Sequence, residues 1–263
     1  MCGIYGIIKP GGDEILTSIA NSMRDAIYHR GPDNAGLYRE PGLALGNNRL
    51  SIVDLSGGNQ PIFNEDRTLI IVYNGEIYNH IELRGDLEKK GHRFKTNSDT
   101  ETVLHAFEEY GPQCLERFNG IFAFAVWNTR EKSLFLARDS LGVKPLYLAS
   151  MEGGLAFASE AKALLGLLPG GARPNWTALF QFFSYGYVPG QESPFEGIRK
   201  FPAGHFAWFR NNELEMDRYW KPELGMGNPV SIEEACEKVS GLLENSVEME
   251  LMGDVPVGVF LSG

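Results

Sequence analysis

The sequence predicts an α+β protein built as a four-layer αββα sandwich, in which two antiparallel sheets lie between outer helices. Short runs of β-branched and aromatic residues are joined by short polar or glycine-containing connectors, such as residues 128–132 and 150–154, and this pattern is typical of hairpins. Residues 121–127 are apolar at every position, so the sheet that contains them must be covered on both faces. Outer helices provide that cover.

The strands follow from these runs, and the helices follow from spacing and capping residues. The predicted strands are residues 3–8, 69–73, 121–128, 134–138, 146–149, 155–158 and 205–209. Apolar residues at helical spacing predict a helix after the first strand: Ile15, Ile19, Met23, Ala26 and Ile27. Two capping boxes, Asn79 with Glu82 and Ser98 with Glu101, predict two more helices, which end at Gly91 and Gly111.

Composition excludes several classes of protein. The 263 residues are 43% hydrophobic, which is enough for a sizeable core in one large domain or two. The net charge of −10 without a Lys/Arg run argues against nucleic-acid and anionic-membrane partners. The longest apolar run is far shorter than the roughly 18 residues of a membrane span. The three cysteines, Cys2, Cys114 and Cys236, show neither disulfide nor zinc spacing, so we expect a cytoplasmic protein without a structural metal.

A change of composition divides the chain. Prolines and glycines cluster at residues 221–230, which we interpret as a linker after a first domain at residues 1–220. Ser231 and Glu234 then cap a long amphipathic helix, and an apolar strand is predicted at residues 255–261. One helix and one strand cannot bury each other's apolar faces. We therefore expect residues 231–263 to be the truncated start of a second domain.

Cys2 is the first candidate for catalysis. As an isolated residue it is equally compatible with a small buried hydrophobe. Removal of Met1, however, would place a thiol and a free α-amine on one residue, and an amine with a pKa of about 7.7 to 8.0 can act as the base near neutral pH. No histidine partner is then needed.

Asn74 and Gly75 directly follow a predicted strand and allow two interpretations. An Asn-Gly pair is a common turn. Alternatively, the Asn74 amide and the Gly75 N–H form an oxyanion hole, in which glycine permits close backbone approach.

Arg49 and Asp99 are candidates for binding an amino acid. Arg49 stands beside a short apolar stretch, where its guanidinium could hold an α-carboxylate, although a surface arginine is the default interpretation of this residue taken alone. Asp99 falls in the first turn of a predicted helix, where the helix dipole stabilises a carboxylate in any case. Its functional role would be to hold an α-ammonium group.

Several strings together resemble the glutaminase half of the glutamine-hydrolysing asparagine synthetases. They are residues 1–6 (MCGIYG), 29–33 (HRGPD), 49–54 (RLSIVD), 74–79 (NGEIYN), 98–101 (SDTE), 137–139 (ARD), 144–147 (KPLY) and 157–160 (FASE). The resemblance covers nearly the whole chain in order.

This resemblance implies an N-terminal-nucleophile hydrolase fold and a set of roles. Cys2 would be the nucleophile, and Asn74 and Gly75 would form the oxyanion hole. The implied glutamine-binding residues are Arg49, Glu76 and Asp99, with backbone groups of Leu50, Ile52 and Val53. No cofactor or metal is implied for this half, glutamine is the expected substrate, and a homodimer is compatible with the sequence.

The last residues resemble the start of the same family's ATP-pyrophosphatase domain. Leu261, Ser262 and Gly263 would begin its ATP-binding loop, and ATP with Mg²⁺ is expected only for a complete synthetase. The chain would then hydrolyse glutamine through a thioester without activating aspartate. Two alternatives stay open: an amidotransferase that acts on another carboxylate, such as a sugar uronic acid, and a non-catalytic relative that senses glutamine.

Overall fold

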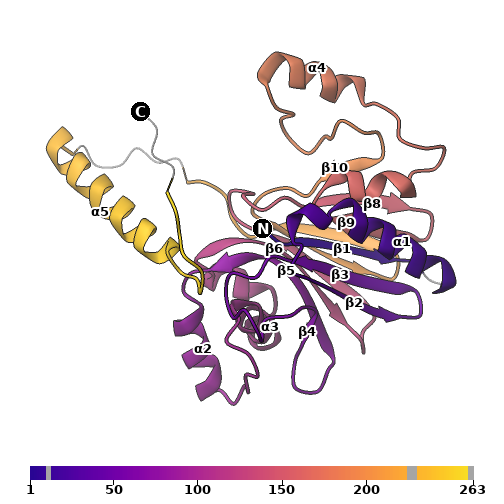
Figure 1. Cartoon of the computed structure of the whole chain (residues 1–263). Helices are drawn as coiled ribbons and strands as arrows, with labels where there is room; N and C mark the ends of the chain where they lie inside the picture. The colour runs from indigo at the N-terminus through magenta and orange to yellow at the C-terminus, as the bar shows by residue number, and fades with distance from the viewer. Residues whose placement is uncertain (10–12, 224–229, 260–263) are drawn as a thin grey trace.

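Two six-stranded antiparallel sheets stack face to face in the computed structural model, which describes residues 1–9, 13–223 and 230–259 (Figure 1). In the first sheet the strand order is β10-β8-β9-β1-β3-β2: β1 (Gly3–Ile8), β2 (Asn34–Glu40), β3 (Leu43–Arg49), β8 (Tyr147–Met151), β9 (Gly154–Ala158) and β10 (Ile198–Lys200). In the second sheet it is β12-β11-β7-β6-β5-β4: β4 (Ile62–Phe63), β5 (Leu69–Ile77), β6 (Gly120–Asn128), β7 (Ser133–Arg138), β11 (His205–Arg210) and β12 (Glu213–Arg218). The predicted α+β arrangement of two antiparallel sheets is confirmed.

Helices cover the outer faces of both sheets. The α-helices are α1 (Asp13–Ala26), α2 (His80–Lys89), α3 (Asp99–Tyr110), α4 (Trp176–Tyr185) and α5 (Ile232–Glu250), and short 3₁₀ helices span Tyr28–Arg30, Gly111–Arg117 and Ala161–Leu167. In Figure 1, α1 lies over the first sheet, and α2 and α3 lie on the far side of the second. The four layers thus alternate as helix, sheet, sheet, helix.

The core consists of three apolar layers that follow from the alternation of side chains along each strand. Between the sheets, Ile4 of β1 packs in the same buried cluster as Val72 of β5. Outside the second sheet, Phe124 of β6 packs in another cluster with Phe107 of α3. Strand β6 contributes to both clusters, because its odd-numbered residues face the first sheet and its even-numbered residues face α3. The continuous apolar run at residues 121–127 has this origin.

The predicted helix starts are only partly correct in their detail. The Ser98 hydroxyl accepts a hydrogen bond from the N–H of Thr100, so it caps α3 as expected. Asn79 precedes α2 but does not cap it, because its side chain instead bonds the backbone of Arg117 and Asn119. The carboxylate of Glu101 likewise does not bond Ser98, because it accepts hydrogen bonds from the N–H groups of Lys95 and Thr96. In both places a tertiary contact replaces the reciprocal capping bond.

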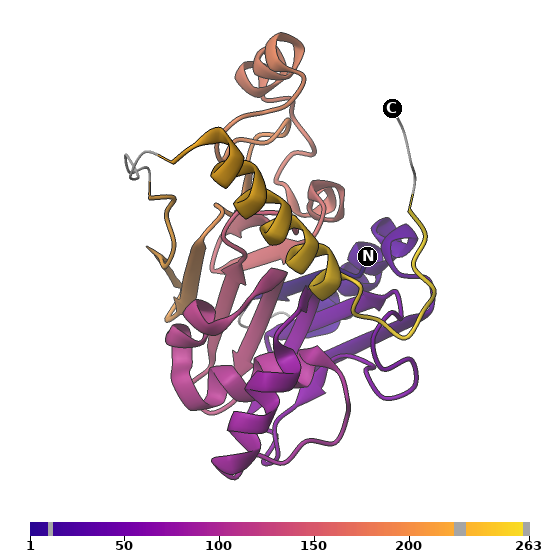
Figure 2. The same cartoon turned by 90° about the vertical axis from the view of Figure 1, so that its left-hand side faces the viewer.

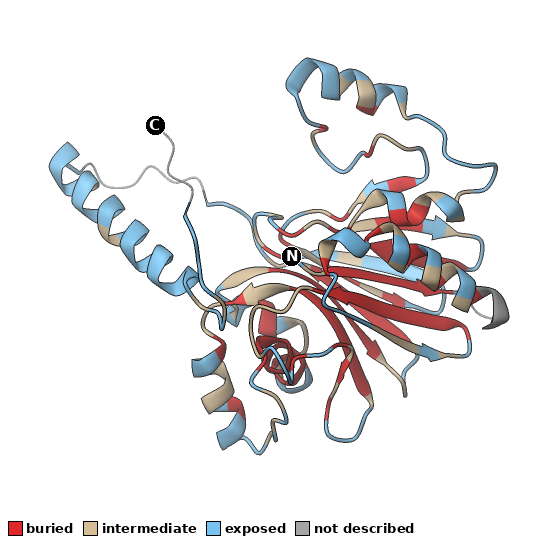
Figure 3. Cartoon of the chain, viewed as in Figure 1, coloured by how far each residue is buried: buried red, intermediate tan, exposed pale blue. Residues whose placement is uncertain are grey.

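Helices α4 and α5 extend away from the sandwich (Figures 1 and 2). No residue of α5 is buried, and its apolar stripe, which includes Val239 and Leu243, is exposed (Figure 3). The segment after α5 returns to the body, where Asp254 bonds the backbone of Ile52 and Asp54. The predicted strand at 255–261 does not form at residues 255–259, and residues 260–261 lie outside the described residues. No helix among the described residues is long and apolar enough to cross a membrane.

Candidate functional site

A small cavity that opens to solvent is lined by every residue that the sequence predicts for glutamine binding and catalysis. These residues are Cys2, Arg49, Leu50, Ile52, Val53, Asn74, Gly75, Glu76 and Asp99. The cavity lies at the end of the sandwich where β1 begins, β3 ends and β5 runs past both. The predicted ATP-loop residues Leu261, Ser262 and Gly263 lie outside the described residues.

Cys2 is half-buried immediately before β1. Its thiol donates a hydrogen bond to the carbonyl of Leu50 over 3.6 Å, and its own carbonyl accepts one from Nε of Arg30 over 2.9 Å. Burial raises the pKa of the Cys2 thiol, while the Leu50 contact and the neighbouring α-amine act in the opposite direction. Burial thus disfavours the thiolate, and a base nearby would help Cys2 to act as a nucleophile.

The α-amine of the chain is a suitable base. In this structure it belongs to Met1, and burial lowers its pKa below the ordinary 8.0. The nearby Lys144 and Arg30 lower the pKa further, whereas the Cys2 thiolate raises it. Burial thus favours the neutral form of this amine, which can accept a proton.

Asn74 lies inside a strand and not in a turn. It pairs with Ala123 of β6 within β5, which continues to Ile77, so the turn interpretation and the predicted strand end at Tyr73 are both wrong. By alternation, its side chain points to the same inter-sheet face as Val72. The residue is 1% exposed, and its amide Nδ2 has no hydrogen-bond partner among the described residues. A buried donor without a partner is costly, so it is a natural site for a ligand oxygen.

Gly75 is required by the neighbouring strand. A Cβ at this position would lie 2.5 Å from the carbonyl oxygen of Ile121, so the glycine permits the close approach of β6. The sequence had led us to expect glycine here for the oxyanion hole. The N–H groups of Tyr73 and Ile77 point away from β6 and bond the side chains of Gln60 and Asp99. Because residues two apart share a direction, the Gly75 N–H points to this same edge of β5.

Asp99 begins α3, as predicted, and is buried beneath the cavity. Its Oδ2 accepts hydrogen bonds from the Tyr73 hydroxyl over 2.8 Å and the Ile77 N–H over 3.1 Å. Burial raises the pKa of the Asp99 carboxyl, while these hydrogen bonds lower it. Glu76, farther along β5, also has a pKa raised by burial, which Lys144 opposes.

Arg49 has a structural task that the sequence did not reveal. The residue is 3% exposed, and its guanidinium donates to the carbonyls of Val53, Asp54 and Leu55 and to Oδ1 of Asn59. These bonds hold the loop that carries the Leu50, Ile52 and Val53 backbone at the cavity. The positive charge of Arg49 is therefore fixed at the cavity wall.

Seven lining residues were not predicted as site residues from the sequence, and three of them support the site: Gln60, Tyr73 and Lys144. Tyr73 and Gln60 support Asp99 and β5 through the bonds described above, and no motif marked them. Lys144 lies in the string of residues 144–147, which resembles the family, so the sequence could have indicated it as a site residue. Its backbone N–H bonds the buried carboxylate of Asp139, which fixes the turn before β8.

The two stacked sheets and the thiol at the start of β1 agree with a comparison of this chain with known proteins. Two solved structures share the fold: glutamine phosphoribosylpyrophosphate amidotransferase from B. subtilis, at a TM-score of 0.61, 19% identity and coverage of 84% of this chain and 50% of that one, and an allosteric regulatory enzyme of purine biosynthesis, at a TM-score of 0.62, 21% identity and the same coverage. The fold is that of an N-terminal-nucleophile glutamine amidotransferase. At this identity the likeness concerns the fold alone.

Residues 1–220 match the family described as "Glutamine amidotransferase domain", and the chain belongs to this family. Among curated relatives, a glutamine-hydrolysing asparagine synthetase of Bacillus subtilis is 38% identical over 100% of this chain and 43% of its own length. Relatives of the same description from Dictyostelium discoideum and Methanocaldococcus jannaschii are 36% and 35% identical, again over the whole chain and over 43% and 55% of their own lengths. The chain thus spans about half the length of these relatives.

Proposed function

We propose that this chain hydrolyses the side-chain amide of glutamine to glutamate and ammonia, with Cys2 as the nucleophile after removal of Met1. The observation that carries the proposal is the buried Asn74 amide, which lacks a partner among the described residues and lines the same cavity as the Cys2 thiol. A donor held in this way is already oriented toward an oxygen that develops negative charge during the reaction.

The reaction begins with transfer of the Cys2 thiol proton to the α-amine of the same residue. The thiolate sulfur bonds the carboxamide carbon of glutamine, and the C=O electron pair moves to the oxygen. Asn74 Nδ2–H and the Gly75 N–H donate to that oxygen. The amine returns the proton to the leaving nitrogen, the C–N bond breaks, and ammonia leaves a γ-glutamyl thioester. Water, deprotonated by the amine, then attacks the thioester and releases glutamate and the free thiol.

The same cavity contains groups that can bind the α-ammonium and the α-carboxylate of glutamine. Asp99 supplies a carboxylate for the α-ammonium, and Arg49 supplies a fixed positive charge for the α-carboxylate. Glu76 and the backbone of Leu50, Ile52 and Val53 complete the proposed glutamine site. Because Arg49 already holds four loop groups, its contribution to binding combines charge with the position of the loop.

We also propose that the ammonia serves the synthesis of asparagine in a longer protein. The asparagine synthetase names of the relatives support aspartate as the acceptor over a sugar uronic acid. In this proposal residues 1–220 form the glutaminase domain, residues 221–230 the linker and residues 231–263 the start of the synthetase domain. ATP and Mg²⁺ would be needed only by that second domain, and the cytoplasm would supply both substrates.

An ammonia-release assay with glutamine tests the hydrolysis. The chain with a verified Cys2 N-terminus should release ammonia, Cys2→Ala should not, and the control Cys236→Ala should behave as the unmodified chain, because Cys236 is exposed on α5. Trapped γ-glutamyl thioester on Cys2 by mass spectrometry would give direct support. Glutamine binding without ammonia release from the unmodified chain would favour the non-catalytic sensor instead.

A further inference from the structure

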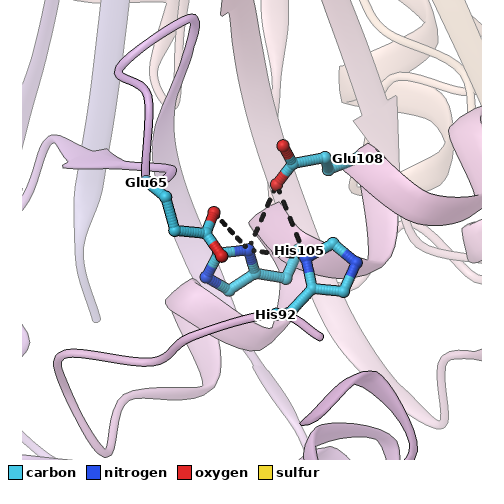
Figure 4. Close-up of side chains that lie close together, drawn as sticks. All are labelled: Glu65, His92, His105 and Glu108. Carbon is cyan, nitrogen blue, oxygen red and sulfur yellow. Dashed lines mark hydrogen bonds and ion pairs between the residues drawn. The ribbon is translucent and has the colours of Figure 1, made fainter. Parts of the chain in front are cut away.

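Four side chains converge on one point next to α3, apart from the glutamine cavity (Figure 4). Glu65 comes from the loop between β4 and β5, His92 follows α2, and His105 and Glu108 lie on one face of α3. One ligand atom from each side chain lies within 4.8 Å of all the others. No sequence motif marks this cluster, because its residues are spread over more than forty positions of the chain.

Four of the six separations between these atoms are close to the spacing of ligands around one small metal ion, and all six are within 4.8 Å. Zn²⁺ binds nitrogen at about 2.0 to 2.1 Å and carboxylate oxygen at about 2.0 to 2.2 Å, so tetrahedral ligands lie roughly 3.3 to 3.5 Å apart. Nδ1 of His105 lies 3.2 Å from Nδ1 of His92 and 3.2 Å from Oε2 of Glu108. The Glu108 oxygen is 3.6 Å from His92 Nδ1, and Oε2 of Glu65 is 3.6 Å from His105 Nδ1.

Both carboxylates are oriented by a bond to their second oxygen. Oε1 of Glu65 accepts a hydrogen bond from the N–H of Arg93 over 2.8 Å, which leaves Oε2 directed at the cluster. Oε1 of Glu108 accepts one from Nδ2 of Asn64 over 2.8 Å, which likewise leaves Oε2 for the cluster. The side chains that would bind the ion are thus held in place by groups outside the cluster.

On each imidazole, the ring nitrogen that does not face the cluster lies near a carboxylate outside the cluster. Nε2 of His92 lies 3.4 Å from Oε2 of Glu109, within hydrogen-bond distance, whereas Nε2 of His105 lies 3.8 Å from Oε1 of Glu101, beyond that distance. A carboxylate behind a ligating histidine fixes the tautomer and increases the basicity of the other nitrogen, which is the usual arrangement in zinc sites.

Charge and access are also suitable for a divalent cation. The carboxylates of Glu65 and Glu108 together balance a charge of +2, so a bound ion would displace any imidazole proton and the histidines would bind it as neutral ligands. A surface hollow lined by residues that include Glu65, His92 and Glu108 gives an ion a route from solvent. A proton is the competing occupant, because the surrounding carboxylates raise the pKa of His105 to about 9 against the effect of burial.

We propose that Glu65, His92, His105 and Glu108 form a structural Zn²⁺ site. Four protein ligands leave no open position for a substrate, so the ion would serve stability and not catalysis. It would join the β4–β5 loop and the α2–α3 connection to α3. Since Asp99 begins α3, the ion would also steady one wall of the glutamine cavity.

Zinc binding to the metal-free chain tests the proposal, with matched pairs of variants. His92→Gln and Glu65→Gln remove ligands from half-buried or exposed positions, so both proteins should fold. The controls are His205→Gln on β11 and Glu116→Gln on the 3₁₀ helix Gly111–Arg117, because neither residue belongs to the cluster. The unmodified chain and the controls should bind about one Zn²⁺ and show a higher Tm with zinc, whereas each ligand variant should bind at least about tenfold more weakly.

Co²⁺ replaces Zn²⁺ as a spectroscopic probe in the same proteins. Visible bands of tetrahedral Co²⁺ without a thiolate charge-transfer band would support the nitrogen and oxygen ligands. Three results would overturn the proposal. They are equal zinc affinity in all five proteins, a thiolate band that persists in His92→Gln, and failure of the unmodified chain to bind zinc. The last result would leave a proton on His105 as the occupant of the cluster. None of these readouts depends on glutaminase activity.

Discussion

The hydroxyl of Tyr73 on β5 donates a 2.8 Å hydrogen bond to the Asp99 carboxylate at the start of α3. This contact joins the second sheet to its covering helix directly beneath the cavity, and neither residue can shift without the other. It also favours the charged form of the carboxylate that we assign to the α-ammonium of glutamine.

Tyr73→Phe should weaken glutamine binding more than it slows the chemistry. Loss of a hydrogen bond to a charged group costs about 1.5 to 3 kcal/mol, so KM should rise about tenfold or more with kcat changed far less. Steady-state ammonia release over a range of glutamine concentrations gives both constants. Tyr187→Phe, at an exposed tyrosine, is the control and should leave them unchanged. A fall in kcat at constant KM would contradict the assignment of Asp99 to substrate binding.

The raised pKa of Asp99 predicts how stability depends on pH. Burial places the folded-state pKa of this carboxyl above its unfolded value, so its contribution to stability is present at low pH and is lost as pH rises through the folded pKa. Asp99→Asn should remove this loss and raise the Tm at neutral pH relative to the unmodified chain, while glutamine binding fails. Thermal unfolding from pH 4 to pH 8 measures the effect. Asp217→Asn, at an exposed position on β12, should show the unmodified profile; a neutral-pH Tm of Asp99→Asn below that of the unmodified chain would refute the prediction.

Asn74→Ala should reduce kcat by about 10²- to 10³-fold, because it removes one donor to the oxyanion. KM and folding should change little, since the Asn74 amide nitrogen has no partner to lose among the described residues. Single-turnover thioester formation, followed by mass spectrometry, locates the defect at the first chemical step. A variant that keeps most of its kcat would exclude Asn74 from the oxyanion hole.

Gly75→Ala and Gly85→Ala should have opposite effects on stability. The new methyl at position 75 would lie 2.5 Å from the Ile121 carbonyl oxygen and force β5 away from β6, at a cost of about 1 to 3 kcal/mol. At position 85, inside α2, a Cβ meets nothing within 4 Å, and alanine should stabilise the helix by about 0.5 to 1 kcal/mol. Denaturant unfolding of both variants checks the pair, and equal stabilities would show that the strand spacing at Gly75 is not tight.

Much of the sandwich was predictable because its strands are apolar on both faces. Residues 121–128 and 134–138 carry that signal and form β6 and β7 almost as predicted. Strand β3 was missed, since it contains Asn47, Asn48 and Arg49, which read as exposed. The fold buries both asparagines and satisfies their amide nitrogens with the carbonyls of Tyr73 and Arg24, which come from distant parts of the chain.

By itself the sequence determined the alternation of apolar residues and the start of α3, and its family resemblance indicated most of the residues around the cavity. Local chemistry is sufficient for the first two features, because propensity and side-chain period act over a few neighbouring residues. The tertiary structure decided that Asn74-Gly75 is strand and not turn, because pairing with β6 outweighs the turn preference of that dipeptide. It also directed the Arg49 guanidinium to its own loop and brought His92 to His105, since both outcomes depend on contacts between segments that only the packed sheets and helices bring together.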